Sequence, residues 1–117
     1  MNTYFYVGND ERGKLGISVF VFQQIAEDTV KSLVNEGELK YSVVYQFGNK
    51  STKVKATIEK GIVHVDISII GIRGSDLQTS CSMLQKAVYE NIYDITEISA
   101  LKVNVSVLSI IDKDEGK

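Results

Sequence analysis

Three residues of the types found in hydrolase triads alternate along one segment of the chain, namely His64, Asp66 and Ser68. On a strand they stand at positions i, i+2 and i+4, so neighbours lie about 6.6–7 Å apart along its axis. A triad needs hydrogen-bond contacts of about 2.6–3.2 Å and an oxyanion hole. Alternating polar residues on a solvated strand face explain the pattern better, so these residues do not predict a catalytic site.

Cys81 is the single cysteine, so no internal disulfide is expected. It falls on the apolar stripe of a predicted helix, where a thiol usually packs as a small hydrophobic group. The chain has no Cys-x-x-Cys pair and no histidine cluster, so no metal site is predicted. Its carboxylates are scattered, and no pair is placed for acid–base work. We therefore expect no catalytic, cofactor or metal site.

The segment GIRG, residues 71–74, is the best candidate for an anion site. By its letters it matches the GxxG loop of KH domains, which joins two helices and clamps a nucleic-acid backbone. Here it joins a strand to a helix, so the context differs. In the anion hypothesis, Arg73 lies beside the free amides of Gly74 and Ser75 at a helix N-terminus. The alternative, which we favour, is that the glycines only permit a sharp chain reversal.

A hairpin in the second half of the chain is the clearest structural element. If Lys60 and Gly61 form a two-residue turn, Glu59 faces Ile62 and the register follows. One face is then wholly apolar and the other polar, and a slip of one residue would mix them. The apolar pairs are Ile58–Val63, Ala56–Val65 and Val54–Ile67, and the polar pairs are Thr57–His64, Lys55–Asp66 and Lys53–Ser68.

Two helices flank this hairpin in the sequence. Ser18 is the expected N-cap of the first helix, which apolar residues at helical spacing continue to about Leu33. Ser75 and Gln78 have the spacing of a capping box at the start of the second helix. The apolar stripe of the second helix comprises Leu77, Cys81, Leu84, Val88, Ile92 and Ile95.

A short strand at 14–17 and a last strand at 101–111 complete the order βαββαβ. This order predicts an α+β two-layer sandwich, with both helices on one face of a mainly antiparallel sheet and the other face exposed. Residues 41–47 are either an extra edge strand or a loop on the core. The length of 117 residues predicts a single domain, with a flexible arm at 1–12 and a flexible tail at 112–117.

Four apolar residues occupy strand positions whose side chains should point to the polar face of the sheet: Ile70, Ile72, Leu108 and Ile110. A helix connects the last two strands, so these strands should run parallel. Their apolar ends would then form one outward patch, and such patches often mark partner surfaces. The alternative is that residues 4–6 or residues 41–47 cover the patch.

Composition narrows the classes of partner. The net charge of −2 gives no bulk attraction to nucleic acid or anionic lipid, so nucleic acid is disfavoured. No run approaches the ~20 apolar residues that cross a bilayer, and the first residues lack the pattern of a secretion signal. We expect a cytoplasmic protein that does not insert into a membrane directly but could reach one through a partner.

Four segments carry a family resemblance: GKLGIS before the first helix, KGIVHVDISIIGIRG with its glycine turn and valine-rich strand, LQKAVYENIYDITEI in the second helix, and LKVNVSVLSI in the last strand. In this order they resemble the alkaline-shock-protein family of Gram-positive bacteria, as in a distant member. The chain departs from the family at SLVNEGEL, where members usually close the first helix with a Gly-Val pair.

The resemblance implies a non-enzymatic cytoplasmic protein of envelope-stress homeostasis, without a cofactor. Some members of that family self-associate and attach to the membrane through a separate anchor protein. We therefore expect a binding or scaffold protein that self-associates or docks on a protein partner. The alternative is a regulatory domain that binds an anion or nucleic acid through Arg73, Gly74 and Ser75.

Overall fold

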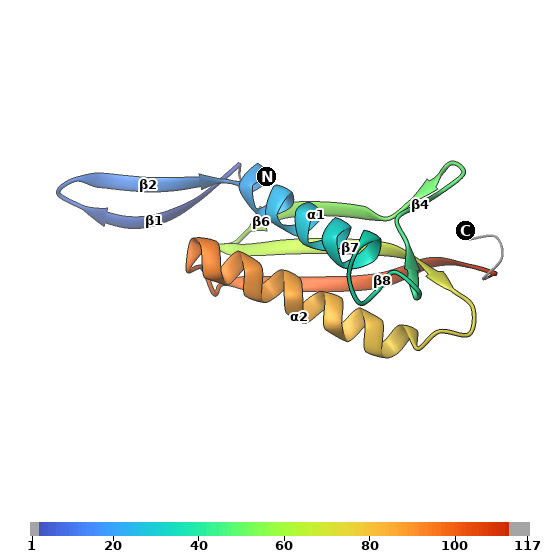
Figure 1. Ribbon diagram of the computed structural model, residues 1–117. Helices are drawn as coiled ribbons and strands as arrows, with labels where there is room; N and C mark the ends of the chain where they lie inside the picture. The colour runs from blue at the N-terminus through green and yellow to red at the C-terminus, as the bar shows by residue number, and fades with distance from the viewer. Residues whose placement is uncertain (1–2, 113–117) are drawn as a thin grey trace.

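The computed structural model describes residues 3–112. Two helices, α1 (Val19–Asn35) and α2 (Leu77–Thr96), lie side by side on one face of a sheet (Figure 1). The central strand β7 (Ile62–Ile72) pairs antiparallel with β6 (Lys53–Glu59) and parallel with β8 (Leu101–Ile111). The predicted α+β class, with a mostly antiparallel sheet, is confirmed.

The β6–β7 hairpin has the predicted register, from Lys53 opposite Ser68 to Glu59 opposite Ile62. Its turn residues Lys60 and Gly61 have φ of 52° and 74°, the backbone conformation that two-residue hairpin loops favour. The parity then buries the apolar side chains against the helices and leaves the polar ones on the open face.

Capping residues fix where each helix begins. The predicted cap of α1 is confirmed, because the Ser18 hydroxyl accepts a hydrogen bond from the amide of Phe20 at 3.2 Å. The predicted capping box of α2 is wrong: the N-cap is Asp76, whose carboxylate accepts from both the amide and the hydroxyl of Thr79. Ser75 instead donates its hydroxyl to the carbonyl of Ile72 at 2.6 Å. A carboxylate provides two acceptor oxygens, so Asp76 satisfies more donors than Ser75 would.

The core lies between the helices and the sheet. It contains Phe22 and Val30 of α1, Leu84 and Ile92 of α2, and the inward valines of the sheet. A hydrogen bond from Asn91 Nδ2 to Thr29 Oγ1, at 2.9 Å, joins the two helices. The predicted stripe of α2 ends one turn early, because Ile95 is 65% exposed.

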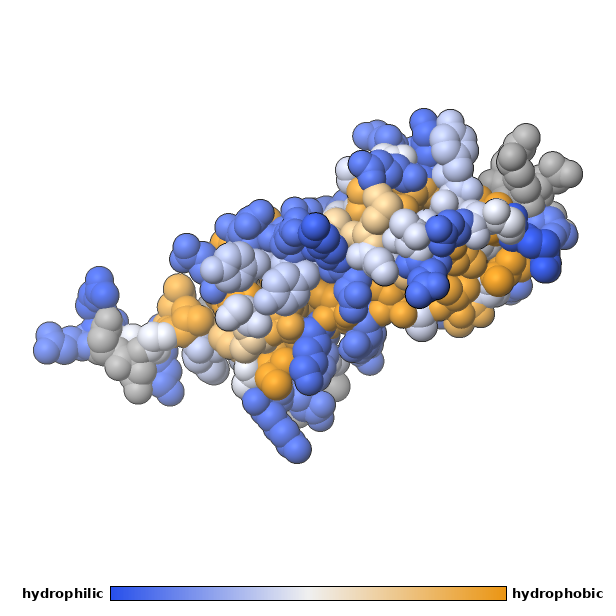
Figure 2. Space-filling view, turned by 90° about the horizontal axis from the view of Figure 1, so that it is seen from below, coloured by the Kyte–Doolittle hydropathy of each residue, from blue (hydrophilic) through white to orange (hydrophobic). Residues whose placement is uncertain are grey.

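The N-terminal part differs most from expectation. The strand expected at 14–17 is β2 (Gly13–Ser18), but it pairs with β1 (Tyr4–Asp10) and does not join the central sheet. The segment expected as a flexible arm thus contains a strand. The β1–β2 hairpin projects from one end of the molecule, whose extents are 59 × 24 × 19 Å (Figure 1). The same elongated outline is seen from below (Figure 2).

Residues 41–47 combine the two alternatives. β3 (Val43–Val44) is a short edge strand that pairs antiparallel with the end of β7. β4 (Gln46–Phe47) and β5 (Lys50–Ser51) form a small hairpin of their own. This segment lies at the end of the sheet opposite the β1–β2 hairpin (Figure 1). Of the expected tail, residues 113–117 lie outside the described part of the chain.

Candidate interaction surface

Two of the three triad-like residues, Asp66 and Ser68, make contacts across the open sheet face. Asp66 Oδ1 accepts a hydrogen bond from Asn104 Nδ2 at 3.1 Å. The hydroxyl oxygens of Ser68 and Ser106 lie 3.4 Å apart. These polar groups therefore link β7 to β8, as cross-strand pairs on a solvated face do.

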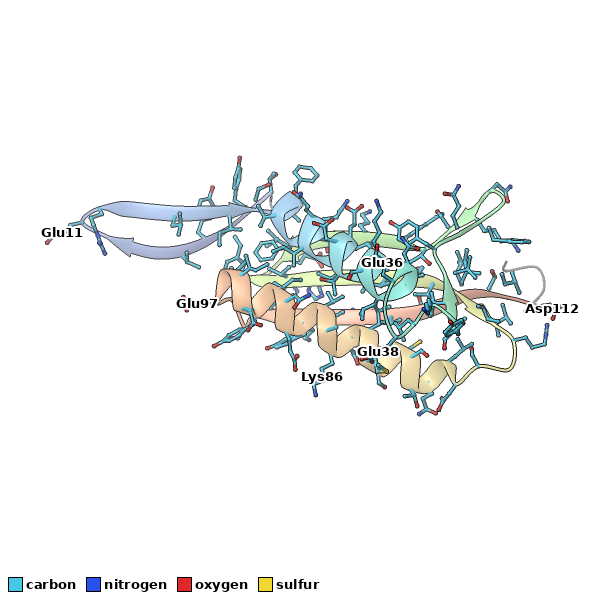
Figure 3. The ribbon with its side chains drawn as sticks, in the orientation of Figure 1. Glu11, Glu36, Glu38, Lys86, Glu97 and Asp112 are labelled. Carbon is cyan, nitrogen blue, oxygen red and sulfur yellow. The ribbon has the colours of Figure 1, made fainter. Side chains whose placement is uncertain are left out.

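Other reactive groups are isolated from one another. Cys81 is half-buried, and this burial raises the pKa of its thiol, which disfavours the thiolate. Among residues 3–112, no group of three or more His, Cys, Asp or Glu side chains could hold a metal ion. Among the labelled charged side chains, Glu11 lies at the tip of the β1–β2 hairpin and Asp112 at the opposite end of the molecule (Figure 3).

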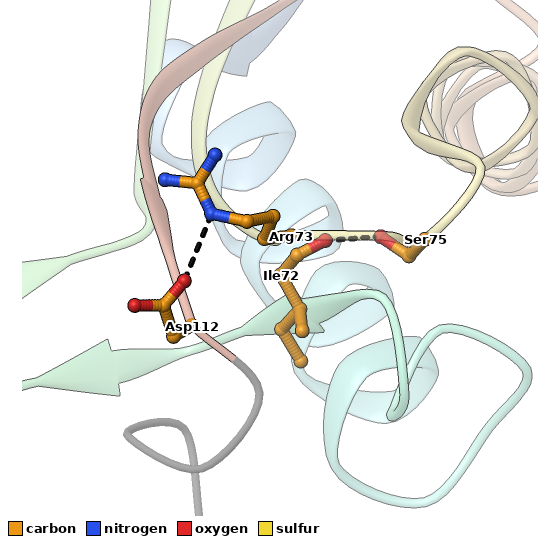
Figure 4. A network of polar contacts seen from close by, with 4 residues as sticks. All are labelled: Ile72, Arg73, Ser75 and Asp112. Carbon is orange, nitrogen blue, oxygen red and sulfur yellow. Dashed lines mark hydrogen bonds and ion pairs between the residues drawn. The ribbon is translucent and has the colours of Figure 1, made fainter.

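Arg73 and Ser75, two residues of the candidate anion site, already have partners within the chain. Arg73 Nε donates to Asp112 Oδ1 at 2.8 Å, in an exposed ion pair (Figure 4). The amide of Ser75 donates to the carbonyl of Ile72 at 3.2 Å. Gly74 adopts a positive φ of 89°, which a sharp chain reversal requires. The geometry therefore favours the role of a turn.

The helix N-terminus beside this turn carries its own anion. Hydrogen bonds from the hydroxyl and then the amide of Thr79 lower the pKa of Asp76 below its usual range. The carboxylate is therefore ionised at neutral pH and occupies the position that a bound phosphate would take. A second anion would meet this negative charge.

The predicted apolar patch does not form as one outward surface. Ile70 and Ile72 are only 0% and 8% exposed. They make a second, small core with Ile111, against which Val44 and Phe47 pack. Leu108 and Ile110 are 52% and 47% exposed. The prediction is therefore wrong for the two β7 residues, which the segment 41–47 covers as in the alternative.

A β-bulge explains why parity failed here. Ile69 pairs with Val107, but Ile70 pairs with Ser109, so Leu108 is an extra residue in β8. One inserted residue moves each later side chain of the strand to the sheet face opposite the one that regular alternation predicts. Ile110 therefore pairs with Gly71 and does not share a face with Ile70.

The outer edge of β8 is one of two open edges of the central sheet among residues 3–112, because β6 likewise pairs with β7 alone. Within residues 3–112, β8 pairs with β7 alone. The carbonyl of Ala100 accepts a hydrogen bond from the amide of Val63 at 2.9 Å, so the backbone groups of Ala100 point inward, toward β7. Along a strand in a parallel ladder, residues whose backbone groups point toward the neighbouring strand alternate with residues whose backbone groups point outward, away from it. It follows that the backbone groups of Val103, Val105 and Val107 point away from β7.

A groove accompanies this edge. It has a volume of about 570 Å³ and lies between α2 and the first half of β8. Gln85, Lys86 and Tyr89 form its α2 side, and Leu101 and Val103 are among its β8 residues. Gln85 Nε2 donates to the carbonyl of Val103 at 2.7 Å, so one outward carbonyl of the edge is already bonded.

Exposed apolar side chains continue beyond the groove. Val107 is 40% exposed, and the exposed Leu108 and Ile110 follow it along the strand. The view from below, the side on which α2 and β8 lie, shows hydrophobic surface interrupted by polar groups (Figure 2). Sequence reasoning allowed for contacts through main-chain edges but did not specify this one, although a last strand with one assigned neighbour was a signal for it.

Exposed apolar side chains also lie on the β1–β2 hairpin, with Tyr4 and Tyr6 on one face and Leu15, which pairs with Val7, on the other. The rings of Tyr4 and Tyr6 are 6.2 Å apart, and the Lys14 ammonium lies 5.6 Å from the centre of the Tyr6 ring. Among residues 3–112 this hairpin is a two-stranded sheet, so its strands also have unpaired outer edges.

No protein-family model matches the chain, and neither does a curated protein or a solved structure. Within residues 3–112, neither helix combines the length and the apolar character that a bilayer-crossing segment needs.

Proposed function

We propose that this protein is a non-enzymatic binding and scaffold module that self-associates through the outer edge of β8. The observation that carries this proposal is that, in the part of the chain from residue 3 to residue 112, no strand pairs with the outer edge of β8. It combines free backbone donors and acceptors at Val105 and Val107 with exposed apolar side chains from Val107 to Ile110.

The edge has only part of the usual protection against pairing. Natural sheets block their edges with lysines, prolines, bulges or short strands. Here Lys102 and the bulge at Leu108 are such features, but the strand has eleven residues, and its four outward-bonding positions before the bulge are Leu101 and three valines. Such an edge is a template on which another strand can add with main-chain hydrogen bonds.

The wider role rests on the resemblance to alkaline-shock proteins. It supports a cytoplasmic role in envelope-stress homeostasis, in which the assembled module docks on a protein partner such as a membrane anchor protein. The anion-binding alternative has less support, because Arg73 and the helix N-terminus are already paired with the carboxylates of Asp112 and Asp76.

Sedimentation velocity tests the proposal. We expect the wild type to pass from monomer to a larger species between about 5 µM and about 500 µM, because an interface of one strand pair is small and weak. Val107→Lys should shift this transition at least tenfold upward, because it places a charge on the edge. Tyr41→Lys is the matched control, since it charges an exposed aromatic position outside β8.

Two results would count against the proposal. A wild type that stays monomeric throughout the range removes self-association. An assembly that weakens equally in both variants shows that charge itself, and not the β8 edge, is responsible. Thermal unfolding of both variants by circular dichroism confirms that the fold is retained.

A further inference from the structure

We infer that the occupant of the β8 edge is a second copy of this chain, whose β8 pairs antiparallel about a two-fold axis at Val105. This inference rests on the proposed self-association and specifies its register. Two central sheets would then join into one, with the helices of both copies on the same side. The isologous arrangement closes by itself, so it gives a dimer and no filament.

The backbone of β8 fits this register. An antiparallel pair centred on an outward-pointing residue lets Val105 exchange both of its hydrogen bonds with Val105 of the second copy. Val103 then exchanges its bonds with Val107 of the second copy, and the reverse pair is equivalent. The carbonyl of Val103 has two lone pairs, so it can accept this amide while it keeps the bond from Gln85.

The side chains of β8 are also complementary to themselves in this register. On the helix side, valine faces valine at each pair among Val103, Val105 and Val107. On the open side, Asn104 faces Ser106 of the second copy, so polar groups meet at the two central pairs, and Lys102 faces Leu108 at each end. Cross-strand pairs of like polarity are those that stabilise a sheet.

The two neighbouring registers fit less well. An axis at Asn104 would pair Val107 with Leu101, whose amide already donates to the carbonyl of Ser99 at 2.8 Å. An axis at Ser106 would bring Leu108, the extra residue of the bulge, one pair closer to the centre, opposite Asn104, whereas the axis at Val105 leaves it at the end of the ladder, opposite Lys102. The register about Val105 uses the regular part of the strand and ends where the bulge begins.

The groove provides a place for the exposed Val107. In this register Val107 of one copy lies beside Val103 of the other, where Gln85, Lys86 and Tyr89 line the groove. Because α2 runs opposite to β8 (Figure 1), the turn before Gln85 lies nearest the axis. That turn presents the exposed, uncharged Ser82, so no like charges meet there.

Disulfide trapping tests the register. Asn104→Cys and Ser106→Cys are made separately in a Cys81→Ala background, mixed in equal amounts at a concentration where the wild type is assembled, and oxidised. Residues facing each other in a non-hydrogen-bonded pair have Cα atoms about 4.5 Å apart, within disulfide range. We expect the mixed 104–106 disulfide, identified by mass spectrometry, to exceed each of the two homodisulfides at least fivefold.

Each other outcome has a distinct meaning. Dominance of the 104–104 homodisulfide indicates the axis at Asn104, and dominance of the 106–106 homodisulfide indicates the axis at Ser106. Either result overturns this inference and leaves the proposed self-association in place. Assembly without any enriched disulfide also overturns the inference and places the contact elsewhere, with the β1–β2 hairpin as the next surface. A wild type that does not assemble at any concentration tested overturns both this inference and the proposed self-association.

Discussion

Ile70 and Leu108 provide a sharp comparison of buried and exposed positions. Parity on regular strands assigns both residues to one outward patch, whereas the structure buries Ile70 completely and leaves Leu108 half exposed. We therefore expect Ile70→Ala to lower the free energy of unfolding strongly and Leu108→Ala to leave it nearly unchanged.

The size of the effect follows from the packing of Ile70. The substitution removes three side-chain carbons, which at about 0.8 kcal/mol each contribute about 2.4 kcal/mol. The cavity left against Val44 and Phe47 adds to this loss, and buried Ile→Ala substitutions cost about 2–5 kcal/mol. For a domain of this size, a loss of about 3 kcal/mol lowers Tm by roughly 10–15 °C. Leu108→Ala should change stability by less than about 0.5 kcal/mol.

Urea unfolding followed by far-ultraviolet circular dichroism measures both variants, at a protein concentration where the wild type is monomeric. Ile69→Ala is the positive control, because Ile69 is fully buried on the helix side of the same strand. If Ile70→Ala costs no more than Leu108→Ala while Ile69→Ala is strongly destabilising, the second small core does not exist as described.

Two further predictions concern the helices. Asp76→Ala should destabilise the protein at neutral pH, whereas Ser75→Ala should have the smaller effect. Because folding lowers the pKa of Asp76, its contribution is present above the ordinary carboxyl pKa and is lost as pH falls through the folded-state pKa. The difference between Asp76→Ala and wild type, measured by urea unfolding, should therefore shrink in acid. Asn91→Ala removes the hydrogen bond to Thr29 and should cost about 1 kcal/mol in the same assay. An unchanged urea midpoint would show that this bond contributes nothing.

Local rules predicted the middle of the fold correctly. The register of β6 and β7 follows from a two-residue turn and strict alternation, so it depends only on residues 53–68. The cap at Ser18 is likewise a contact between neighbours in the chain. These features were readable because each is decided within a few residues.

Long-range choices were not readable from the sequence. Whether 14–17 joins the central sheet depends on a competing partner, and β1 supplies one next to it in the chain. The bulge at Leu108 could not be found by parity counting, because that method assumes one residue of β8 for each residue of β7. The open edge of β8 depends on the order of strands in space, which the order in sequence does not fix.

Amide hydrogen exchange along β8 tests the central claim most directly. In dilute protein, the outward amides of Val105 and Val107 should exchange quickly, while the inward amides of Asn104 and Ser106 are protected by β7. At the concentration where the protein assembles, we expect the outward amides to become protected as well, with the inward ones unchanged. Outward amides that exchange at the same rate at both concentrations would contradict the role proposed for this edge.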